Sequence, residues 1–269
     1  MSRNLKLTIA YDGSEFHGWQ IQPDLPTVQG ILSDVIGRVT GEKVLPQGSG
    51  RTDTGVHAMA QVASFVSETT IPLVNFRKVL NDRLPPAIRV LSVEEMPTDF
   101  HARHSAIAKT YEYRVHRGDL VPPWLSRYVA HHPWPLEEQA VFAAASQVIG
   151  EHDFTSFAAV DPDRAVRSEE DDSPEEFSTS QTYLVPRHAT NVRTIFESAW
   201  RHEGDEITYT VTGNGFLHHM VRNLVGTFLL VGKGTWTPDD VKRILEAKDR
   251  SAAGPTAPAS GLWLMKVKY

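Results

Sequence analysis

Hydrophobic and polar residues alternate in several short runs along the chain, which is the pattern of strands with one buried face. The first run contains Leu5, Leu7 and Ile9 and leads into the turn-forming residues YDGS at 11–14. By the same criterion we predict strands over residues 5–9, 61–67, 88–93, 109–116, 192–200, 206–212 and 262–267.

Apolar residues at helical spacing fill most of the intervals between these runs. Thr27 can cap a helix that extends to Gly41, and Thr237 can cap another with Pro238 at its first position. The clearest apolar stripe runs from Leu217 to Leu229. We also predict helices over residues 72–84 and 136–149.

Strands and helices are mixed in both parts of the chain, which indicates an α+β fold with a mainly antiparallel central sheet flanked by helices. We expect two halves, residues 1–104 and 105–269. At 269 residues and 41% hydrophobic content, the chain is long enough to bury one large core or two fused smaller ones.

Composition narrows the chemistry that the protein can perform. The chain contains no cysteine, which excludes disulfides, cysteine-ligated zinc and a cysteine nucleophile. No apolar run approaches the roughly 20 residues of a membrane span, and the first residues lack the apolar segment of a signal peptide. We therefore expect a soluble, cytoplasmic protein with no membrane partner.

The negative charge of the chain is concentrated in one segment. The formal net charge is −6, and residues 161–177 alone carry eight acids against two arginines, a local net charge that is also −6. The rest of the chain therefore sums to zero and can still present a basic face. We predict that residues 161–180 form a disordered acidic insertion, because such a polar run cannot bury enough apolar surface to fold.

The segment GSGRTDTGVHA at 48–58 concentrates the candidate chemistry. Its three glycines permit a tight loop that can approach a ligand closely. The segment lacks the G-x-x-x-x-G-K-[ST] pattern of a phosphate-binding loop. From the residues alone, Arg51 and Asp53 could serve a ligand site or could be a surface arginine beside a turn-forming aspartate.

Several segments together resemble the TruA family of tRNA pseudouridine synthases. The resemblance is carried by GRTDTGVHA at 50–58 with Gln61, YDGS at 11–14, GWQ at 18–20, TVQ at 27–29, KTYEYR at 109–114, GEHDF at 150–154, GFL at 215–217, MVRN at 220–223 and APASGL at 257–262. These segments occur in the family's order over nearly the whole chain, and the acidic insertion lies between them.

The resemblance implies the pseudouridine synthase fold with a central active-site cleft. It also implies a homodimer that binds the anticodon arm of tRNA and isomerises uridine at positions 38 to 40, without a metal or an organic cofactor. The reaction breaks the C1′–N1 bond of a uridine that has left its stack and rejoins the base through C5.

The family match assigns roles to five residues. Asp53 is the catalytic carboxylate, which either attacks a carbon covalently or removes a ribose proton. Arg51 helps to hold the nucleotide out of the stack, and Leu262 packs against the target base. Tyr111 stacks on the uracil, and its phenol could take the C5 proton. Arg222, at the edge of its helix's apolar stripe, is the expected ion-pair partner of Asp53.

The histidines of the chain could in principle bind a metal ion, but their spacing in the sequence argues against a metal site. His218 and His219, if both lie on a helix, diverge by about 100°, and the pattern H-E-x-x-H does not occur. We therefore predict no metal site.

Basic residues in the first half and early second half are candidates for phosphate contacts with tRNA. They are Arg77, Lys78, Arg83, Arg103, His104, Lys109, Arg114, His116 and Arg117. Two other functions fit the sequence less well. A catalytically idle RNA-binding module would not need a buried carboxylate, and a glycosidase or nucleosidase would generally need a second carboxylate beside Asp53.

Overall fold

The computed structural model describes residues 2–159 and 190–269. The acidic insertion predicted over residues 161–180 lies outside these ranges.

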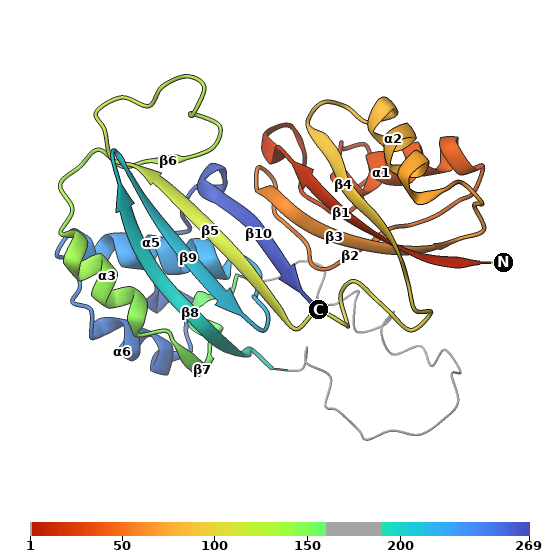
Figure 1. The fold of residues 1–269 in the computed structure, drawn as a ribbon. Helices are drawn as coiled ribbons and strands as arrows, with labels where there is room; N and C mark the ends of the chain where they lie inside the picture. Colours follow the sequence, from red (N-terminus) through yellow and green to blue (C-terminus); the bar gives the residue numbers. More distant parts are fainter. Residues whose placement is uncertain (1, 160–189) are drawn as a thin grey trace.

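A single mixed sheet runs through the described part of the chain (Figure 1). Its main strands lie in the order β4-β1-β3-β10-β5-β9-β8-β7. Pairings β3–β10 and β5–β6 are parallel, and the other pairings between named strands are antiparallel. The strands are β1 (Arg3–Tyr11), β2 (Gln47–Gly48), β3 (His57–Ser67), β4 (Ile88–Met96), β5 (Ala108–His116), β6 (Ala130–His131), β7 (Gly150–Asp153), β8 (Val192–Glu203), β9 (Glu206–Gly213) and β10 (Leu262–Lys268).

The C-terminal strand β10 joins the early and late parts of the sheet. Trp263 and Leu264 pair with β3, and the other edge of β10 pairs with β5 along most of its length. The segment that carries Asp53 immediately precedes β3, whereas Tyr111 lies on β5. The two candidate residues are therefore brought together by a strand from the end of the chain.

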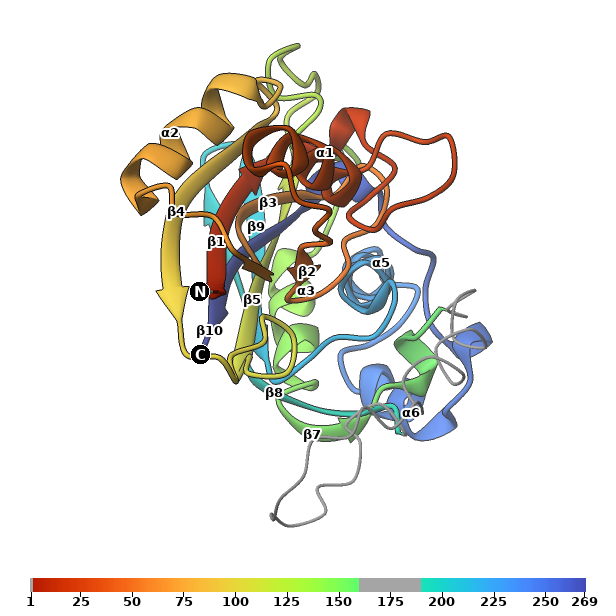
Figure 2. The ribbon, with the colours of Figure 1, turned by 90° about the vertical axis from the view of Figure 1, so that its right-hand side faces the viewer.

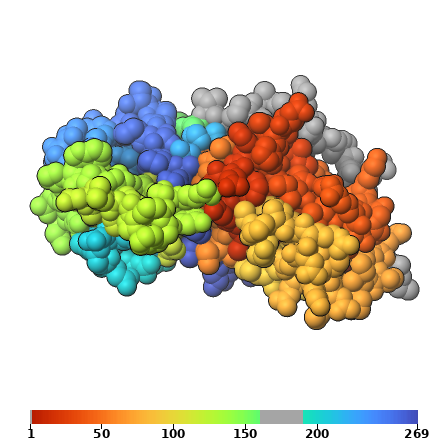
Figure 3. Space-filling model, turned by 90° about the horizontal axis from the view of Figure 1, so that it is seen from above, coloured from red at the N-terminus to blue at the C-terminus, as the bar shows by residue number. Residues whose placement is uncertain are grey.

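Helices cover the sheet in two groups. Figure 1 shows α1 (Val28–Thr40) and α2 (Leu73–Arg83) with β1, β3 and β4, and Figure 2 shows α5 (Met220–Gly232) and α6 (Asp240–Ala247) on one side of the strand layer. Helix α3 (Glu138–Ser146) packs on α5 and β8. Figure 3 shows the early residues and the late residues gathered into two lobes. The α+β class is confirmed.

Local signals predicted most elements to within a few residues. The Thr27 hydroxyl accepts a hydrogen bond from the Gly30 N–H at the start of α1, and Gly41 ends the helix with φ +79°. Thr237 behaves differently from the predicted cap: its N–H and hydroxyl both donate to the Asp240 carboxylate, and regular helix starts at Asp240.

The beginning of α5 corrects the sequence prediction. The apolar stripe suggested a helix from Leu217, but regular helix starts at Met220. The residue before it, His219, has left-handed backbone angles (φ 59°), which a continuous helix does not allow. His218 and His219 thus lie on a turn ahead of the helix.

No helix in residues 2–159 and 190–269 is long and apolar enough to cross a membrane.

Candidate active site

The loop that carries Asp53 connects β2 to β3 and is held by side chains of the sheet. The Ser49 hydroxyl donates to Oε1 of Gln61 at 2.7 Å, and Nε2 of Gln61 donates to the Gly50 carbonyl at 2.9 Å. The Thr52 hydroxyl lies 2.8 Å from the Tyr11 hydroxyl. These bonds are mostly buried, so they fix the loop more firmly than exposed contacts would.

Asp53 forms an ion pair with Arg222 from helix α5. Nη1 of Arg222 lies 3.0 Å from Oδ2 of Asp53, and the two side chains are 15% and 20% exposed. Nε of the same guanidinium donates to the Ala257 carbonyl at 2.7 Å. This second bond fixes the orientation of the guanidinium, so that one nitrogen faces Asp53. The sequence predicted this pairing.

Close packing of the segment 255–257 against α5 makes the Ala257 contact possible. The Ala257 N–H donates to the Arg222 carbonyl at 3.1 Å. A Cβ atom added to Gly226, one turn further along α5, would lie 1.7 Å from the Pro255 carbonyl oxygen. Only glycine at 226 allows this approach.

We expect Gly226→Ala to lower the free energy of unfolding by at least about 3 kcal/mol, because the clash is with backbone and cannot be relieved by a rotamer change. Urea unfolding measures the effect. Gly234→Ala is the control: it has φ +76° and no heavy atom within 4 Å of the added Cβ, so only the backbone strain of about 1 to 2 kcal/mol applies. Equal losses in the two variants would contradict the packing argument.

Two histidines complete the surroundings of Asp53. Nε2 of His218 lies 3.5 Å from Oδ1, and Nε2 of His219 lies 3.3 Å from Oδ2. The two rings face each other with centroids 3.9 Å apart. Burial lowers the pKa of His219, and the charge of Asp53 partly opposes that shift.

This arrangement overturns the geometric argument against a metal. The argument assumed that His218 and His219 both lie on a helix and diverge. The left-handed residue His219 instead turns both rings toward Asp53. Among residues 2–159 and 190–269, these three form the one group of three or more histidine, aspartate or glutamate side chains whose possible ligand atoms all lie within 4.8 Å of one another.

Tyr111 and Leu262 lie on the neighbouring strands β5 and β10. Tyr111 is buried, with its ring 5.0 Å from that of Phe216 in an edge-on contact. Burial raises the pKa of Tyr111, and the nearby acidic groups of Tyr11 and Asp53 raise it further. Leu262 is also buried and lies opposite Tyr113 in the β5–β10 ladder. The Arg51 side chain, by contrast, is exposed on the loop.

Lys109 supports the loop from β5. Its ammonium donates to the Ser49 carbonyl at 2.5 Å, and a Cβ atom at Gly50 would lie 2.7 Å from Nζ. The pKa of Lys109 is lowered to about 8, chiefly by burial and further by the charges of Arg103 and Arg193. Lys109 therefore has a structural role in holding the loop.

The low pKa of Lys109 gives the stability of the protein a pH dependence. An unfolded lysine titrates near pH 10.4, so between about pH 8 and 10 the unfolded chain binds more protons and stability rises with pH. We expect a contribution of up to about 2 kcal/mol over this range, measured by urea unfolding, and its loss in Lys109→Met. The exposed Lys266→Met should keep the slope; a slope unchanged in Lys109→Met would contradict the assignment.

Two other predicted tRNA contacts are also used within the protein. His116 is 5% exposed and its Nε2 lies 3.1 Å from the Leu120 carbonyl. The Arg117 guanidinium donates to the carbonyls of His132 and Trp134. Both residues hold the chain that follows β5. Arg77, Lys78, Arg83 and His104 are exposed.

His57 anchors the end of the loop in a way that the sequence did not reveal. Its Nδ1 accepts from the Gly13 N–H at 3.0 Å, its Nε2 lies 2.9 Å from the Arg127 carbonyl, and its ring stacks on Trp263 at 4.4 Å. Burial lowers the pKa of His57, so a neutral ring that donates from Nε2 fits both contacts. His57 therefore joins the loop to β10 and to the chain around residue 127.

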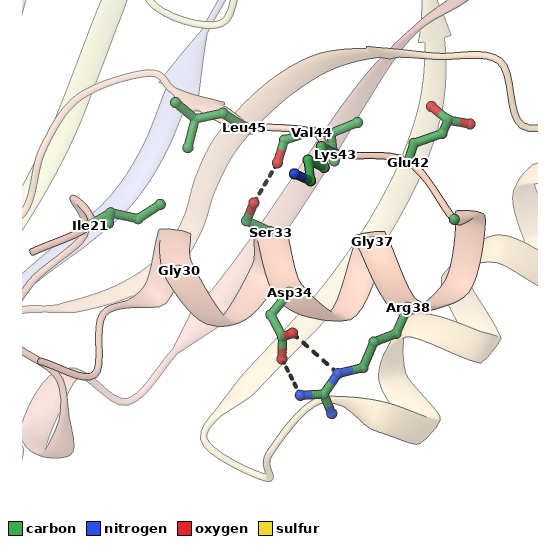
Figure 4. A pocket seen from close by; sticks show the side chains of 11 residues that line it. Ile21, Gly30, Ser33, Asp34, Gly37, Arg38, Glu42, Lys43, Val44 and Leu45 are labelled. Atoms are coloured by element: carbon green, nitrogen blue, oxygen red, sulfur yellow. Dashed lines mark hydrogen bonds and ion pairs between the residues drawn. The ribbon is translucent and has the colours of Figure 1, made fainter. Parts of the chain in front are cut away.

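The cavity drawn in Figure 4 is separate from these residues. It lies beside α1 and is lined by Ile21, Gly30, Ser33, Asp34, Gly37, Arg38, Gly41, Glu42, Lys43, Val44 and Leu45. Asp34 and Arg38 pair with each other there, and the Ser33 hydroxyl donates to the Val44 carbonyl. None of the lining residues belongs to the Asp53 cluster.

Comparison with known proteins agrees with the family resemblance of the sequence. A family model described as tRNA pseudouridine synthase matches residues 7–105 and 175–269. A protein of Solibacter usitatus named tRNA pseudouridine synthase A is 45% identical over 99% of this chain and all of its own length. Proteins with the same name from Brevibacillus brevis and Lacticaseibacillus casei are 40% and 42% identical, over 99% and 98% of this chain and 100% and 98% of their own lengths.

Proposed function

The chain belongs to the tRNA pseudouridine synthase family, enzymes that isomerise uridine in tRNA, and from this premise we propose that Asp53 is its catalytic carboxylate. The observation that carries the proposal is the 3.0 Å ion pair between Asp53 and Arg222, which joins a β2–β3 loop to a helix 169 residues later in the chain. An exposed structural aspartate would not need a half-buried arginine oriented by a second bond.

The position of Asp53 suits a carboxylate that acts on a flipped nucleotide. Its side chain is 20% exposed, so a ribose can reach an oxygen while most of the group is shielded from water. Arg222 places a positive charge 3.0 Å from the carboxylate and donates a hydrogen bond to it. Either covalent attack or proton removal from the ribose is compatible with the geometry.

Tyr111 is proposed to stack on the uracil rather than to act as a strong base. Because burial and neighbouring negative charge raise the pKa of Tyr111, its hydroxyl stays protonated at neutral pH. A neutral phenol is a poor proton acceptor, whereas its ring can stack on any base. Leu262, on the adjacent strand, is proposed to pack against the target base, and exposed Arg51 to help hold the nucleotide out of its stack.

The substrate is proposed to be the anticodon stem-loop of tRNA at positions 38 to 40, bound by a cytoplasmic homodimer. Residues 1–104 contribute Asp53, and residues 105–269 contribute Tyr111, Arg222 and Leu262. We propose that a cleft between these two halves receives the nucleotide. Phosphates of the stem would contact the basic residues that remain exposed.

The test is a position-resolved pseudouridine map of unmodified tRNA after incubation with the purified protein. Product at positions 38 to 40 is expected. Tight tRNA binding without product would favour an idle RNA-binding module, and release of free uracil would favour a nucleosidase. Product only at other positions would overturn the anticodon assignment and leave the activity standing.

A further inference from the structure

The proposed catalytic carboxylate of Asp53 and the two histidines beside it offer the types of ligand atom that zinc binds. We propose that Asp53, His218 and His219 form a binding site for Zn²⁺, and that Zn²⁺ bound there blocks the enzyme by occupying the carboxylate. The claim that Zn²⁺ binds here rests on the geometry of the three side chains alone. The claim that bound Zn²⁺ inhibits the enzyme rests on the proposed function of Asp53.

The donor set is one that zinc accepts in proteins. Zinc takes imidazole nitrogens and carboxylate oxygens in tetrahedral sites, and three protein ligands leave a fourth position for water. Bonds of 2.0 to 2.1 Å in such a site place neighbouring ligand atoms about 3.3 Å apart. Nε2 of His218 lies 3.5 Å from Oδ1 of Asp53 and Nε2 of His219 lies 3.3 Å from Oδ2, and one ligand atom from each of the three residues lies within 4.8 Å of the other two.

The histidines are held in this arrangement by the backbone. His219 is one of few non-glycine residues with left-handed angles in the described part of the chain, at φ 59°. Such a conformation costs about 1 to 3 kcal/mol and persists where surrounding structure imposes it. Helix α5, which starts at the next residue, keeps the His219 ring beside His218, with centroids 3.9 Å apart.

The positive charge of Arg222 should limit the affinity of the site for Zn²⁺. Its guanidinium contacts Oδ2 of Asp53, the oxygen that also lies 3.3 Å from Nε2 of His219, so an incoming cation would experience a nearby positive charge. This repulsion should keep the affinity modest and the binding reversible. Mg²⁺ prefers oxygen ligands in an octahedral arrangement and should not compete for two imidazoles. The magnesium that accompanies tRNA would therefore leave the enzyme active.

Isothermal titration of the purified full chain with zinc chloride tests the site directly. The expected result is one site that is weakened at least about 10-fold in His218→Asn and in His219→Asn, because loss of a direct ligand should cost no less than loss of an outer-shell partner. Asparagine is chosen because it tolerates the left-handed backbone at 219. Thermal melting checks that both variants fold.

The matched control is His104→Asn. His104 belongs to a second close histidine pair, whose rings are 4.4 Å apart, but this pair is not part of a three-donor group in the described residues. Its substitution should leave zinc affinity unchanged. Zinc binding that survives in both folded site variants, or the absence of binding to the wild type, would overturn the site.

Activity assays then separate the site from its consequence. Zinc chloride should inhibit pseudouridine formation by the wild type, EDTA should restore it, and the same concentration of magnesium chloride should have no inhibitory effect. Zinc that binds this site without inhibiting an active enzyme would overturn the inhibitory role. An active enzyme that binds no zinc refutes only the site, whereas a protein that binds zinc but makes no pseudouridine refutes only the proposed function.

Discussion

Asp53→Asn is expected to reduce pseudouridine formation by at least about 10³-fold, the scale of loss when a reacting group is removed from an active site. Asparagine has nearly the same shape and can still accept a hydrogen bond from Arg222, but it carries no negative charge to attack or deprotonate the ribose. The measurement is single-turnover conversion of uridine in a tRNA transcript. Affinity for tRNA and the melting temperature should change little.

The control for Asp53→Asn is Asp34→Asn, which makes the same chemical change in an exposed ion pair. Asp34 lies 2.6 Å from Arg38 within helix α1, and both side chains are more than half exposed. Full activity is expected in this variant, with a stability change within about 0.5 kcal/mol. Wild-type turnover by Asp53→Asn would remove this carboxylate from the mechanism.

Arg222→Ala should combine a loss of activity with a loss of stability. Without the guanidinium, Asp53 loses its charge partner and the Ala257 carbonyl loses a hydrogen bond in a half-buried setting. We expect a decrease of about 2 kcal/mol in the free energy of unfolding, typical of hydrogen bonds to charged groups, and at least about 100-fold slower conversion, comparable to loss of an electrostatic contact at a reacting group. Urea unfolding and single-turnover assays measure the two effects.

Two further variants sharpen this test. Arg201→Ala removes an exposed guanidinium that lies 3.8 Å from Glu112, and its stability should stay within about 0.5 kcal/mol of the wild type. Arg222→Lys retains the charge but cannot donate to Ala257 and Asp53 from one planar group, so it should recover only part of the activity. A fully active Arg222→Ala would refute the functional importance of the ion pair.

Several features of the site could be read from local sequence, because they depend on neighbours in the chain. The alternation around Tyr111 predicted strand β5, and Thr27 and Gly41 marked the two ends of α1. Helical spacing placed Arg222 at the edge of an apolar stripe, where a half-buried guanidinium can reach a partner. The family resemblance supplied the identity of that partner, Asp53.

The side chains that surround Asp53 could not be predicted from local sequence, because they come together through tertiary contacts. A stripe of apolar residues cannot show that its first turn is broken at His219, because the spacing of apolar residues does not specify the left-handed conformation of that one residue. The sequence also does not distinguish Lys109, His116 and Arg117 from ordinary surface cations. Their contacts with backbone carbonyls, which only the structure reveals, show that they have structural roles.

The sequence by itself determined most of the elements of this protein and their approximate ends, since periodicity and turn chemistry act over a few residues. The short strands β2, β6 and β7 were not predicted. The family followed from the order of the matching segments. The tertiary structure decided that β10 lies between β3 and β5, which brings Asp53, Tyr111 and Arg222 together. It also decided that two histidines face the same carboxylate. Contacts between residues more than 100 positions apart follow from how the whole sheet closes, and no local pattern encodes them.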